Sequence, residues 1–470
     1  MSAKAILGPL FRVPKSLFAE WELDQIRKQL FYTTKSDARY GMGDSVSFRT
    51  YEEDDEWLIV PRMYGVLGAN RYPQFKDPIV HVSDGAPVVY TFNETLQSTK
   101  PDKKIIQDKL VKKVVSRFQN GEFGGMLVAP CGLGKTVVGL KIAAELGVTT
   151  TVLVHKEFLV DQWKASVAEW LGLGDDDIGV IQQDKCDYEG KKILIAMTQS
   201  LVSAREYDER LFNHSGLLLL DETHRHGAEL WHKAAAKFTC RWRLGLTATP
   251  SRKDGLWDVV RFSVGNIIAE ADAGWVKPLV YRVRYSPRLY IPQYCWARTR
   301  PDGSYQIKKV YLAKLLNLLV ADEGRNKIIL DMIVKAAAKG RKVLLLSDRR
   351  SQISYLESAV KIAAGDSCTV SPYVGGMGKR QRAVAERCQV MLGTFAMACE
   401  GLNVPDLDVL ILATPHSDIV QSVGRVLRDV DGKKQPIVID ICDDEPYMCG
   451  RMAEKRQYTY DKMGWETKII

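Results

Sequence analysis

A glycine-containing loop followed by a lysine and a threonine is the stretch of this sequence best suited to bind a phosphate. It follows the apolar run of residues 125–128 and precedes a helical pattern over residues 137–146. Glycines let backbone N–H groups turn inward around an anion, the lysine adds positive charge for the β- and γ-phosphates, and the threonine hydroxyl can sit on Mg²⁺. The predicted nucleotide-binding residues of this loop are Pro130, Cys131, Gly132, Leu133, Gly134, Lys135 and Thr136.

The loop departs from the strict phosphate-binding motif, because Ala129 stands where a glycine is usual. A glycine-rich turn between a strand and a helix, with an exposed lysine, would give the same pattern. The nucleotide-binding interpretation therefore depends on whether other segments supply the rest of a nucleotide site.

An acidic pair, Asp221 and Glu222, follows the apolar run of residues 217–220. A carboxylate at the end of a buried strand can hold Mg²⁺, usually through water, and the next carboxylate can orient and deprotonate the attacking water. Acidic pairs are common in proteins, so this one gains its meaning from its place downstream of the phosphate loop.

Two hydroxyl side chains, Thr247 and Thr249, flank the end of a further apolar run, and Pro250 stops it. Hydroxyls at such a position can couple a nucleotide site to a neighbouring surface. A plain exit from a strand into a turn would have the same residues.

A glutamine and two arginines form the fourth element of the pattern. Gln421, Arg425 and Arg428 recur at i, i+4 and i+7, so a helix would place them on one face. Two arginines presented together suit a γ-phosphate, as arginine fingers do. Surface arginines are more often simply solvated, which is the alternative for this pair taken alone.

Composition places the chain among ordinary soluble proteins of two to four domains. Of 470 residues, 66 are Lys or Arg and 57 are Asp or Glu, so the net charge of +9 suits a polyanionic partner or a solvated surface equally well. The nine cysteines are scattered without a C-x-x-C pair, which favours a reducing cytoplasm over a disulfide or zinc framework. We expect no membrane span, because no apolar run approaches the necessary length.

Apolar strands alternating with helical patterns predict α/β architecture with parallel sheets, whose active groups gather at the carboxyl ends of the strands. We expect a small α+β accessory domain over residues 1–98, an α/β domain over 99–275 and a second α/β domain over 323–470. Between the two α/β domains, residues 276–322 are predicted to form a hairpin-like bridge with a turn at residues 300–303.

The order of these motifs along two α/β domains resembles that of superfamily 2 DNA helicases and translocases of the DExH type, over roughly residues 103–438. The motifs are the phosphate loop, the Asp-Glu-Thr-His box at 221–224, Thr-Ala-Thr-Pro at 247–250 and Gln-x-x-Gly-Arg-x-x-Arg at 421–428. The Leu-Val-Asp-Gln-Trp segment at 159–163 and the Arg-Lys-Asp-Gly segment at 252–255 are more similar to XPB, RecG and phage UvsW branch-migration helicases than to DEAD-box RNA helicases.

This resemblance implies two tandem RecA-like parallel-sheet domains with ATP and Mg²⁺ bound between them. Lys135 would hold phosphate, Thr136 and Asp221 the metal, and Glu222 would activate water. Gln421, Arg425 and Arg428 would complete the catalytic set. Gln107 occupies the adenine-reading position, although Ile106 replaces the usual aromatic neighbour. The implied nucleic-acid contacts are His155, Lys156, Thr198, Arg349, Gly393 and Thr394, and the implied coupling residues are Thr247, Thr249 and Gly401.

The expected function is an ATP-dependent DNA helicase or translocase that remodels branched DNA, such as replication forks and Holliday-type junctions, in replication, recombination or repair. Two alternatives are an RNA-directed or transcript-release translocase and an ATP-gated nucleic-acid clamp. We expect a monomer in the cytoplasm, or in the host cytoplasm if the protein is phage-encoded, with forked or branched DNA as its partner. Cations of the accessory domain that could meet DNA phosphates are Arg12, Lys15, Arg49, Arg62 and Arg71.

Overall fold

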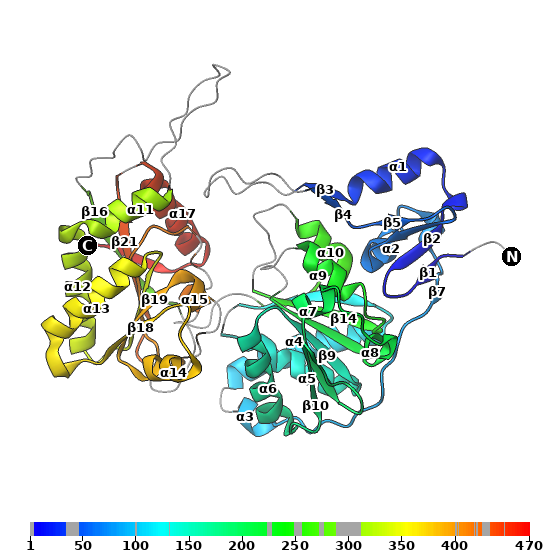
Figure 1. Cartoon of the computed structure of the whole chain (residues 1–470), viewed down its shortest axis with the longest axis horizontal. Coiled ribbons are helices and arrows are strands. Elements are labelled where there is room, and N and C mark those ends of the chain that lie inside the picture. Colours follow the sequence, from blue (N-terminus) through cyan, green and yellow to red (C-terminus); the bar gives the residue numbers. More distant parts are fainter. Residues whose placement is uncertain are drawn as a thin grey trace, which may run out of the picture. The chain divides into compact units, whose positions relative to one another are not determined.

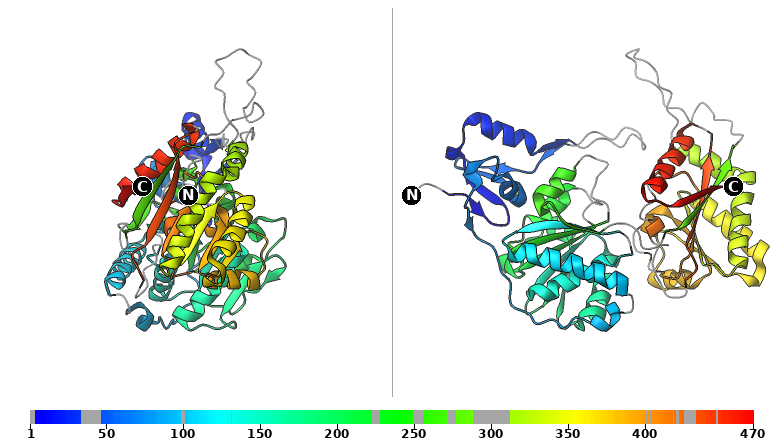
Figure 2. Two further views of the ribbon diagram at one scale, coloured as in Figure 1. Left: turned by 90° about the vertical axis from the view of Figure 1, so that its left-hand side faces the viewer. Right: turned by 180° about the vertical axis from the view of Figure 1, so that it is seen from behind.

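The computed structural model describes residues 4–33, 47–98, 101–130, 132–222, 228–248, 256–271, 277–287, 312–399, 402, 404–417, 419, 422–424, 433–445 and 447–470. These residues divide into two compact units, one up to residue 271 and the other from residue 277 (Figure 1). Each unit contains a largely parallel sheet covered by helices, and the first unit also carries a small N-terminal α+β domain (Figure 2). The predicted fold class is therefore confirmed.

The N-terminal domain is a five-stranded sheet in the order β5-β6-β2-β1-β7, with a two-stranded ribbon β3-β4 beside it. Neighbouring strands are antiparallel except for β1 and β7. Its core is aromatic, and the Phe11 and Phe75 rings lie 5.2 Å apart. The elements are β1 (Ile6–Leu7), β2 (Phe11–Pro14), α1 (Glu20–Gln29), β3 (Phe31–Thr33), β4 (Ser47–Arg49), β5 (Glu52–Glu53), β6 (Trp57–Val60), α2 (Arg62–Gly68) and β7 (Ile79–Val80).

Two buried arginines attach this domain to the first α/β domain. Arg62 donates hydrogen bonds to the carbonyl oxygens of Gly8 and Cys240, both at 2.6 Å. Arg243 donates to the carbonyl oxygens of Pro9 and Phe238, at 2.7 and 2.9 Å. Burial lowers the pKa of both guanidinium groups, and the charge of Arg243 adds to this effect on Arg62. The N-terminal domain is therefore built into the first unit.

The expectation that Arg62 meets DNA phosphates is wrong. Its side chain is fully buried at the junction of two domains, and its guanidinium N–H groups donate to backbone carbonyl oxygens there. The guanidinium group therefore cannot reach a DNA phosphate. Lys15 is also engaged, since its ammonium group donates to the Asp54 carbonyl oxygen at 3.0 Å and lies 3.5 Å from the Glu53 carboxylate. Arg12, Arg49 and Arg71 remain candidates, because their side chains are exposed.

The same junction buries His232, and this predicts a pH dependence of stability. His232 Nδ1 lies 3.0 Å from the Ser263 hydroxyl, and burial together with the nearby positive charge of Arg243 lowers its pKa to about 4. The unfolded chain binds a proton near pH 6.5, whereas the folded chain does so only near pH 4. The free energy of unfolding should therefore fall as the pH drops through this window, by about 2 kcal/mol between about pH 7.5 and pH 5.

Urea unfolding of the wild type and of His232→Gln at both pH values measures this effect. The variant should lose the part of the pH dependence that comes from this group, and His81→Gln, in which an exposed histidine is replaced, should keep it. Equal pH dependence in the wild type and His232→Gln would contradict the assignment.

Residues 83–98 run along the first α/β domain as a strap, which is extended up to residue 93. The Tyr90 hydroxyl donates to the carbonyl oxygens of Val148 and Lys192, and the Phe92 ring stacks on Trp170 at 5.6 Å. Residues 88–90 form no strand, and the strap ends in α3 (Glu94–Ser98). We therefore propose that the accessory domain ends near residue 80 and that the strap belongs to the α/β domain.

The sheet of the first α/β domain has the order β11-β10-β12-β9-β13-β14-β8-β15, and its pairs are parallel except β10 with β11. Its strands are β8 (Gly124–Val128), β9 (Thr150–Val154), β10 (Ile178–Gln182), β11 (Lys185–Cys186), β12 (Ile193–Met197), β13 (Leu217–Asp221), β14 (Trp242–Thr247) and β15 (Ile267–Glu270). The helices are α4 (Pro101–Gln119), α5 (Lys135–Leu146), α6 (Glu157–Leu171), α7 (Thr198–Val202), α8 (Glu209–Asn213), α9 (Ala228–Ala235) and α10 (Trp257–Val264).

Alternate side chains of the central strand β13 pack on opposite faces of this sheet. Leu218 and Leu220 belong to the core that Trp231 of α9 and Val259 of α10 complete. Leu219 faces α5, where a Cβ added at Gly139 would lie 3.6 Å from it. The apolar run of residues 217–220 is continuous because a central parallel strand is buried on both faces.

The second unit has a seven-stranded, wholly parallel sheet in the order β18-β19-β17-β20-β21-β16-β22. Its strands are β16 (Leu279–Tyr285), β17 (Val343–Ser347), β18 (Val370–Tyr373), β19 (Val390–Thr394), β20 (Val409–Leu412), β21 (Ile437–Asp443) and β22 (Glu466–Ile469). The helices are α11 (Leu312–Ala321), α12 (Glu323–Ala338), α13 (Arg350–Ala364), α14 (Lys379–Arg387), α15 (Phe395–Cys399) and α17 (Tyr447–Lys462).

The described part of the expected bridge does not form a hairpin. Residues 279–285 form β16, which lies between β21 and β22 as a parallel strand of the second sheet. Residues 312–321 form α11, and the turn expected at 300–303 lies outside the described residues. Alternating aromatic and β-branched residues identify a strand but not its partner, which is why the sequence pattern misled here.

Candidate nucleotide-binding site

The predicted site residues of the first unit follow neighbouring strands of one sheet. In the register of the sheet, Val128 of β8 pairs with Thr247 of β14, and Leu246 of β14 pairs with Asp221 of β13. On the other side of β13, Val154 of β9 pairs with Met197 of β12. Because these strands are parallel, their carboxyl ends meet at one edge of the sheet. That edge carries the phosphate loop, Thr247, Asp221, Glu222, His155, Lys156 and Thr198.

The phosphate loop has the backbone geometry that a bound anion needs. Gly132 and Gly134 have φ angles of +88° and +86°, a region in which a side chain is strained. Helix α5 begins at Lys135, so the N–H groups of its first turn, including that of Thr136, are available to a phosphate. The Lys135 ammonium group lies 3.4 Å from the Ala129 carbonyl oxygen. Pro130 lies in this loop, and Cys131 lies outside the described residues.

Gln107 is buried behind this loop and holds it. Its Nε2 donates to the Leu133 carbonyl oxygen at 2.6 Å, and its Oε1 accepts from Gln97 Nε2 at 2.9 Å. This contact requires a glycine at position 134, because a Cβ there would lie 2.8 Å from Gln107 Nε2. An amide has a second N–H and further lone pairs, so the adenine-reading role remains a compatible prediction.

A lysine beneath the loop, which the sequence did not single out, ties the strap to the nucleotide helix. Lys141 of α5 lies 2.6 Å from the Glu94 carboxylate and 2.8 Å from that of Asp108. It also donates to Gln97 Oε1 at 2.9 Å. The residues that orient Gln107 are thus fixed by an ionic network around the buried Lys141, which no short-range sequence pattern indicates.

Asp221 is the last residue of β13, and Glu222 follows it directly. Asp221 is 7% exposed, and burial together with the negative charge of Glu222 raises its pKa to about 6. The Trp163 indole and the Lys135 ammonium group oppose this rise. Glu222 has a φ angle of +53°, which is unusual for a residue with a side chain and typical of functional sites.

This arrangement fits Mg²⁺. Buried carboxylates with a raised pKa lack compensating positive charge, which a divalent cation supplies. No group of three or more His, Cys, Asp or Glu side chains placed to hold a metal occurs among the described residues, and Mg²⁺ with nucleotide phosphates needs only one or two carboxylates. Thr136 and Asp221 would hold the ion, which when bound neutralises charge on the phosphates.

Two predicted nucleic-acid contacts at this edge are buried. His155 is 4% exposed, and Thr198 is fully buried and donates to the Val154 carbonyl oxygen at 3.3 Å. Gln199, beside Thr198, donates to the His155 carbonyl oxygen at 2.7 Å. These residues fix the loops after β9 and β12, and the half-buried Lys156 is the most accessible of the three predicted contacts.

In the second unit, Arg349, Gly393 and Thr394 also lie at the carboxyl edge of the sheet, where Ser347 pairs with Thr394. Arg349 Nε donates to Asn317 Oδ1 at 2.6 Å, so part of its guanidinium group is engaged by α11. The other predicted residues, Thr249, Gly401, Gln421, Arg425 and Arg428, lie outside the described residues.

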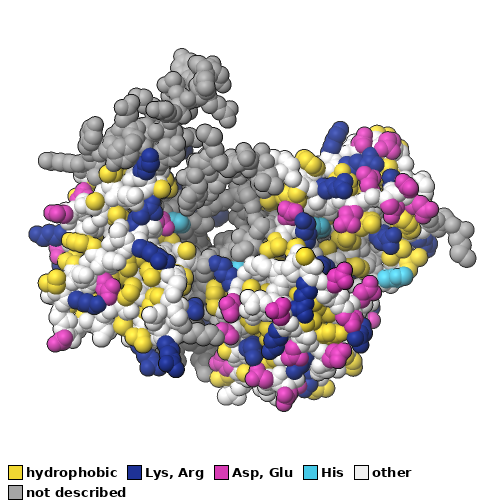
Figure 3. All heavy atoms as spheres, viewed as in Figure 1, with side chains coloured by type: hydrophobic (Ala, Val, Ile, Leu, Met, Phe, Trp, Pro, Cys, Tyr) yellow, Lys and Arg dark blue, Asp and Glu magenta, His cyan; other side chains and the backbone are white. Residues whose placement is uncertain are grey.

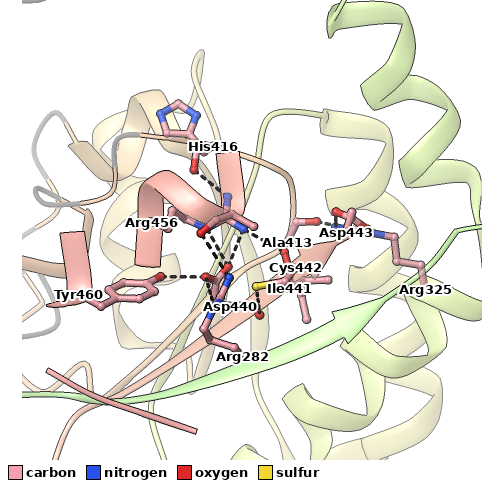
Figure 4. A network of polar contacts seen from close by, with 11 residues as sticks. Arg282, Arg325, Ala413, His416, Asp440, Ile441, Cys442, Asp443, Arg456 and Tyr460 are labelled. Atoms are coloured by element: carbon pink, nitrogen blue, oxygen red, sulfur yellow. Dashed lines mark hydrogen bonds and ion pairs between the residues drawn. The ribbon is translucent and has the colours of Figure 1, made fainter. Parts of the chain in front are cut away.

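A buried ionic network anchors the chain just before the arginine motif (Figure 4). Asp440 of β21 accepts from Arg456 Nε at 2.9 Å and from the Tyr460 hydroxyl at 3.0 Å. Arg456 also donates to the His416 carbonyl oxygen at 2.9 Å. A second pair, Arg325 with Asp443, holds the Ala413 carbonyl oxygen at 2.6 Å. The chain directly after β20 is thus held at Ala413 and at His416.

Each unit has a RecA-like parallel sheet, and the carboxyl edge of the first sheet carries the predicted phosphate loop and acidic pair. Residues 102–252 match the family described as type III restriction enzyme, res subunit. The putative ATP-dependent RNA helicase L396 of Acanthamoeba polyphaga mimivirus is 28% identical over 422 residues, which cover 88% of this chain and 76% of that one.

Two further comparisons agree. The DNA 3'-5' translocase XPB2 of Sulfurisphaera tokodaii is 26% identical over 357 residues, covering 67% of this chain and 77% of that one. The structure of Mss116p bound to single-stranded RNA and AMP-PNP matches in fold with a TM-score of 0.54 and 13% identity, covering 83% and 82% of the two chains. The resemblance to superfamily 2 helicases is confirmed, and it supports an ATP-driven helicase or translocase acting on nucleic acid.

Proposed function

We propose that this protein is an ATP-dependent DNA helicase or translocase that remodels branched DNA. The observation that carries the ATPase part is the convergence of the phosphate loop, Asp221 and Glu222 at the edge of one RecA-like sheet. In this proposal Lys135 binds the β- and γ-phosphates, Glu222 accepts a proton from the attacking water, and Arg425 and Arg428 stabilise the transferred charge.

Nucleic-acid binding in this proposal relies on phosphate contacts distributed over the surface. Figure 3 shows basic and acidic side chains interspersed on the visible face rather than gathered into one basic patch. Phosphate contacts give affinity without reading sequence, so binding should weaken with salt and tolerate any sequence. Among the relatives, the name of XPB2 supports DNA, and the name of L396 favours the RNA-directed alternative.

The N-terminal domain supports the branched-DNA part of the proposal. It is fixed to the first RecA-like domain, so it can present a second binding surface at a constant position. Arg12 lies over the Trp57 ring at 5.1 Å, and Arg49 lies over Tyr51 at 5.5 Å. Arginine combined with aromatic rings is suited to phosphates and unstacked bases, which a junction offers together.

We expect Arg12→Ala with Arg49→Ala to reduce stimulation of the ATPase by forked DNA by roughly 10-fold, while stimulation by linear single strands changes little. Rates would be measured with single-stranded, linear duplex, forked and four-way DNA and with structured RNA. The control, Lys28→Ala with Lys76→Ala, removes the same charge from exposed positions of the same domain. Equal stimulation of the wild type by linear and branched DNA, or stimulation by RNA alone, would contradict the branched-DNA proposal.

A further inference from the structure

Trp163 links the helix of the phosphate loop to the acidic pair. It lies in α6, is 1% exposed, and its indole Nε1 donates to Asp221 Oδ2 at 2.9 Å. Its ring also reaches α5 at Gly139, where an added Cβ would lie 3.7 Å from Trp163 Cη2. A single side chain therefore packs on the helix that begins at Lys135 and holds the carboxylate that ends β13.

We propose that Trp163 is a positioning residue, whose indole N–H holds the Asp221 carboxylate in the orientation that Mg²⁺ binding requires. The inference rests on the proposed function of this site. An indole N–H can only donate, so it keeps Asp221 Oδ2 as an acceptor and fixes the rotation of the carboxylate. The carboxylate also accepts from the backbone N–H of Glu222, and its remaining lone pairs are left for the metal or its bound water.

Packing supports this role, because the indole itself is held on both sides. Gly139 leaves the space that the ring needs against α5, and α6 packs on β9 and β12. A carboxylate held by so rigid a donor loses little orientational freedom when the metal binds. Partners that orient metal ligands in this way typically change metal affinity by about 10- to 100-fold when they are removed.

The variant Trp163→Phe separates this role from simple packing, because it keeps an aromatic ring and removes the N–H donor. Trp170→Phe is the matched control. Trp170 lies in the same helix, and its ring stacks on Phe92 at 5.6 Å, a contact that phenylalanine can keep. Binding of a fluorescent ATP analogue to the full chain is titrated with Mg²⁺ without turnover, and the melting temperature of each variant is recorded.

The Mg²⁺ concentration for half-maximal nucleotide binding should rise by about 10-fold or more in Trp163→Phe and stay unchanged in Trp170→Phe. The same Mg²⁺ dependence in both folded variants would overturn the inference. If Trp163→Phe does not fold, benzothienylalanine at position 163, which replaces the N–H by sulfur in a ring of the same shape, gives the same two outcomes. Absence of Mg²⁺-dependent nucleotide binding in the wild type would instead overturn the proposed function itself.

Discussion

Replacing Glu222 by glutamine is expected to lower the rate of ATP hydrolysis by at least about 100-fold and to leave ATP binding nearly unchanged. Glutamine has the same shape as glutamate and can follow the same backbone, whose φ angle is +53°. Its amide cannot accept a proton from the attacking water, so only the chemical step is lost. Single-turnover hydrolysis and equilibrium binding of a fluorescent ATP analogue separate the two effects.

Glu229→Gln is the matched control for this variant. Glu229 lies nearby in α9, and its carboxylate pairs with Lys233 at 2.7 Å on the surface of the helix. The same chemical change there should leave hydrolysis within about 2-fold of the wild type, since exposed ion pairs contribute little. Turnover near the wild-type rate in Glu222→Gln would remove this residue from its role as the base.

Lys135→Ala is expected to weaken ATP binding by about 10- to 100-fold and to abolish hydrolysis, because the lysine supplies positive charge to the β- and γ-phosphates. The stability of the folded state should change little in this variant. In the structure the Lys135 ammonium group makes a long contact of 3.4 Å with the Ala129 carbonyl oxygen, and its attraction to the Asp221 carboxylate is weaker than the opposing effects of burial and of Glu222. The melting temperature of Lys135→Ala should therefore stay close to that of the wild type.

Lys164→Ala tests whether the loss is specific to the phosphate loop. Lys164 lies on α6 and pairs with the exposed Asp175 at 2.7 Å, so its removal changes the net charge equally without touching the loop. ATP binding should be unchanged in that variant. Wild-type affinity for ATP in Lys135→Ala would exclude this loop as the nucleotide site.

The main strands and the helix that position the candidate nucleotide site could be predicted from the sequence. The apolar runs of residues 125–128 and 217–220 lie in β8 and β13, and the helical pattern over residues 137–146 lies in α5, which begins two residues earlier. The site residues followed, because parallel strands bring their carboxyl ends together and the chemistry-bearing residues stood directly after them.

Long-range partners could not be predicted in this way. The pairing of Trp163 with Asp221 joins residues 58 positions apart, and Arg62 reaches a carbonyl oxygen 178 positions away. In the sequence, Trp163 belonged to a segment that resembles one of helicases, and Arg62 was a candidate for contact with DNA phosphates. Both roles depend on tertiary packing, which periodicity does not encode.

The finding that no described helix has the length and apolar character to cross a membrane agrees with the absence of a long apolar run in the sequence.

The buried ionic pairs of the second unit also could not be predicted from the sequence. Asp440 interrupts the otherwise apolar strand β21 and Asp443 ends it, and only the fold shows that Arg456 and Arg325 compensate their charges.

The rate of ATP hydrolysis with and without nucleic acid tests the central claim most directly. The wild type would be measured alone and with single-stranded DNA, four-way DNA or structured RNA at moderate salt, with Lys135→Ala as the background for contaminating ATPases. We predict Mg²⁺-dependent hydrolysis that nucleic acid stimulates by about 10-fold or more and that rising salt suppresses. Hydrolysis no greater than that of Lys135→Ala under every condition would contradict the assignment of this chain as a nucleic-acid-stimulated ATPase.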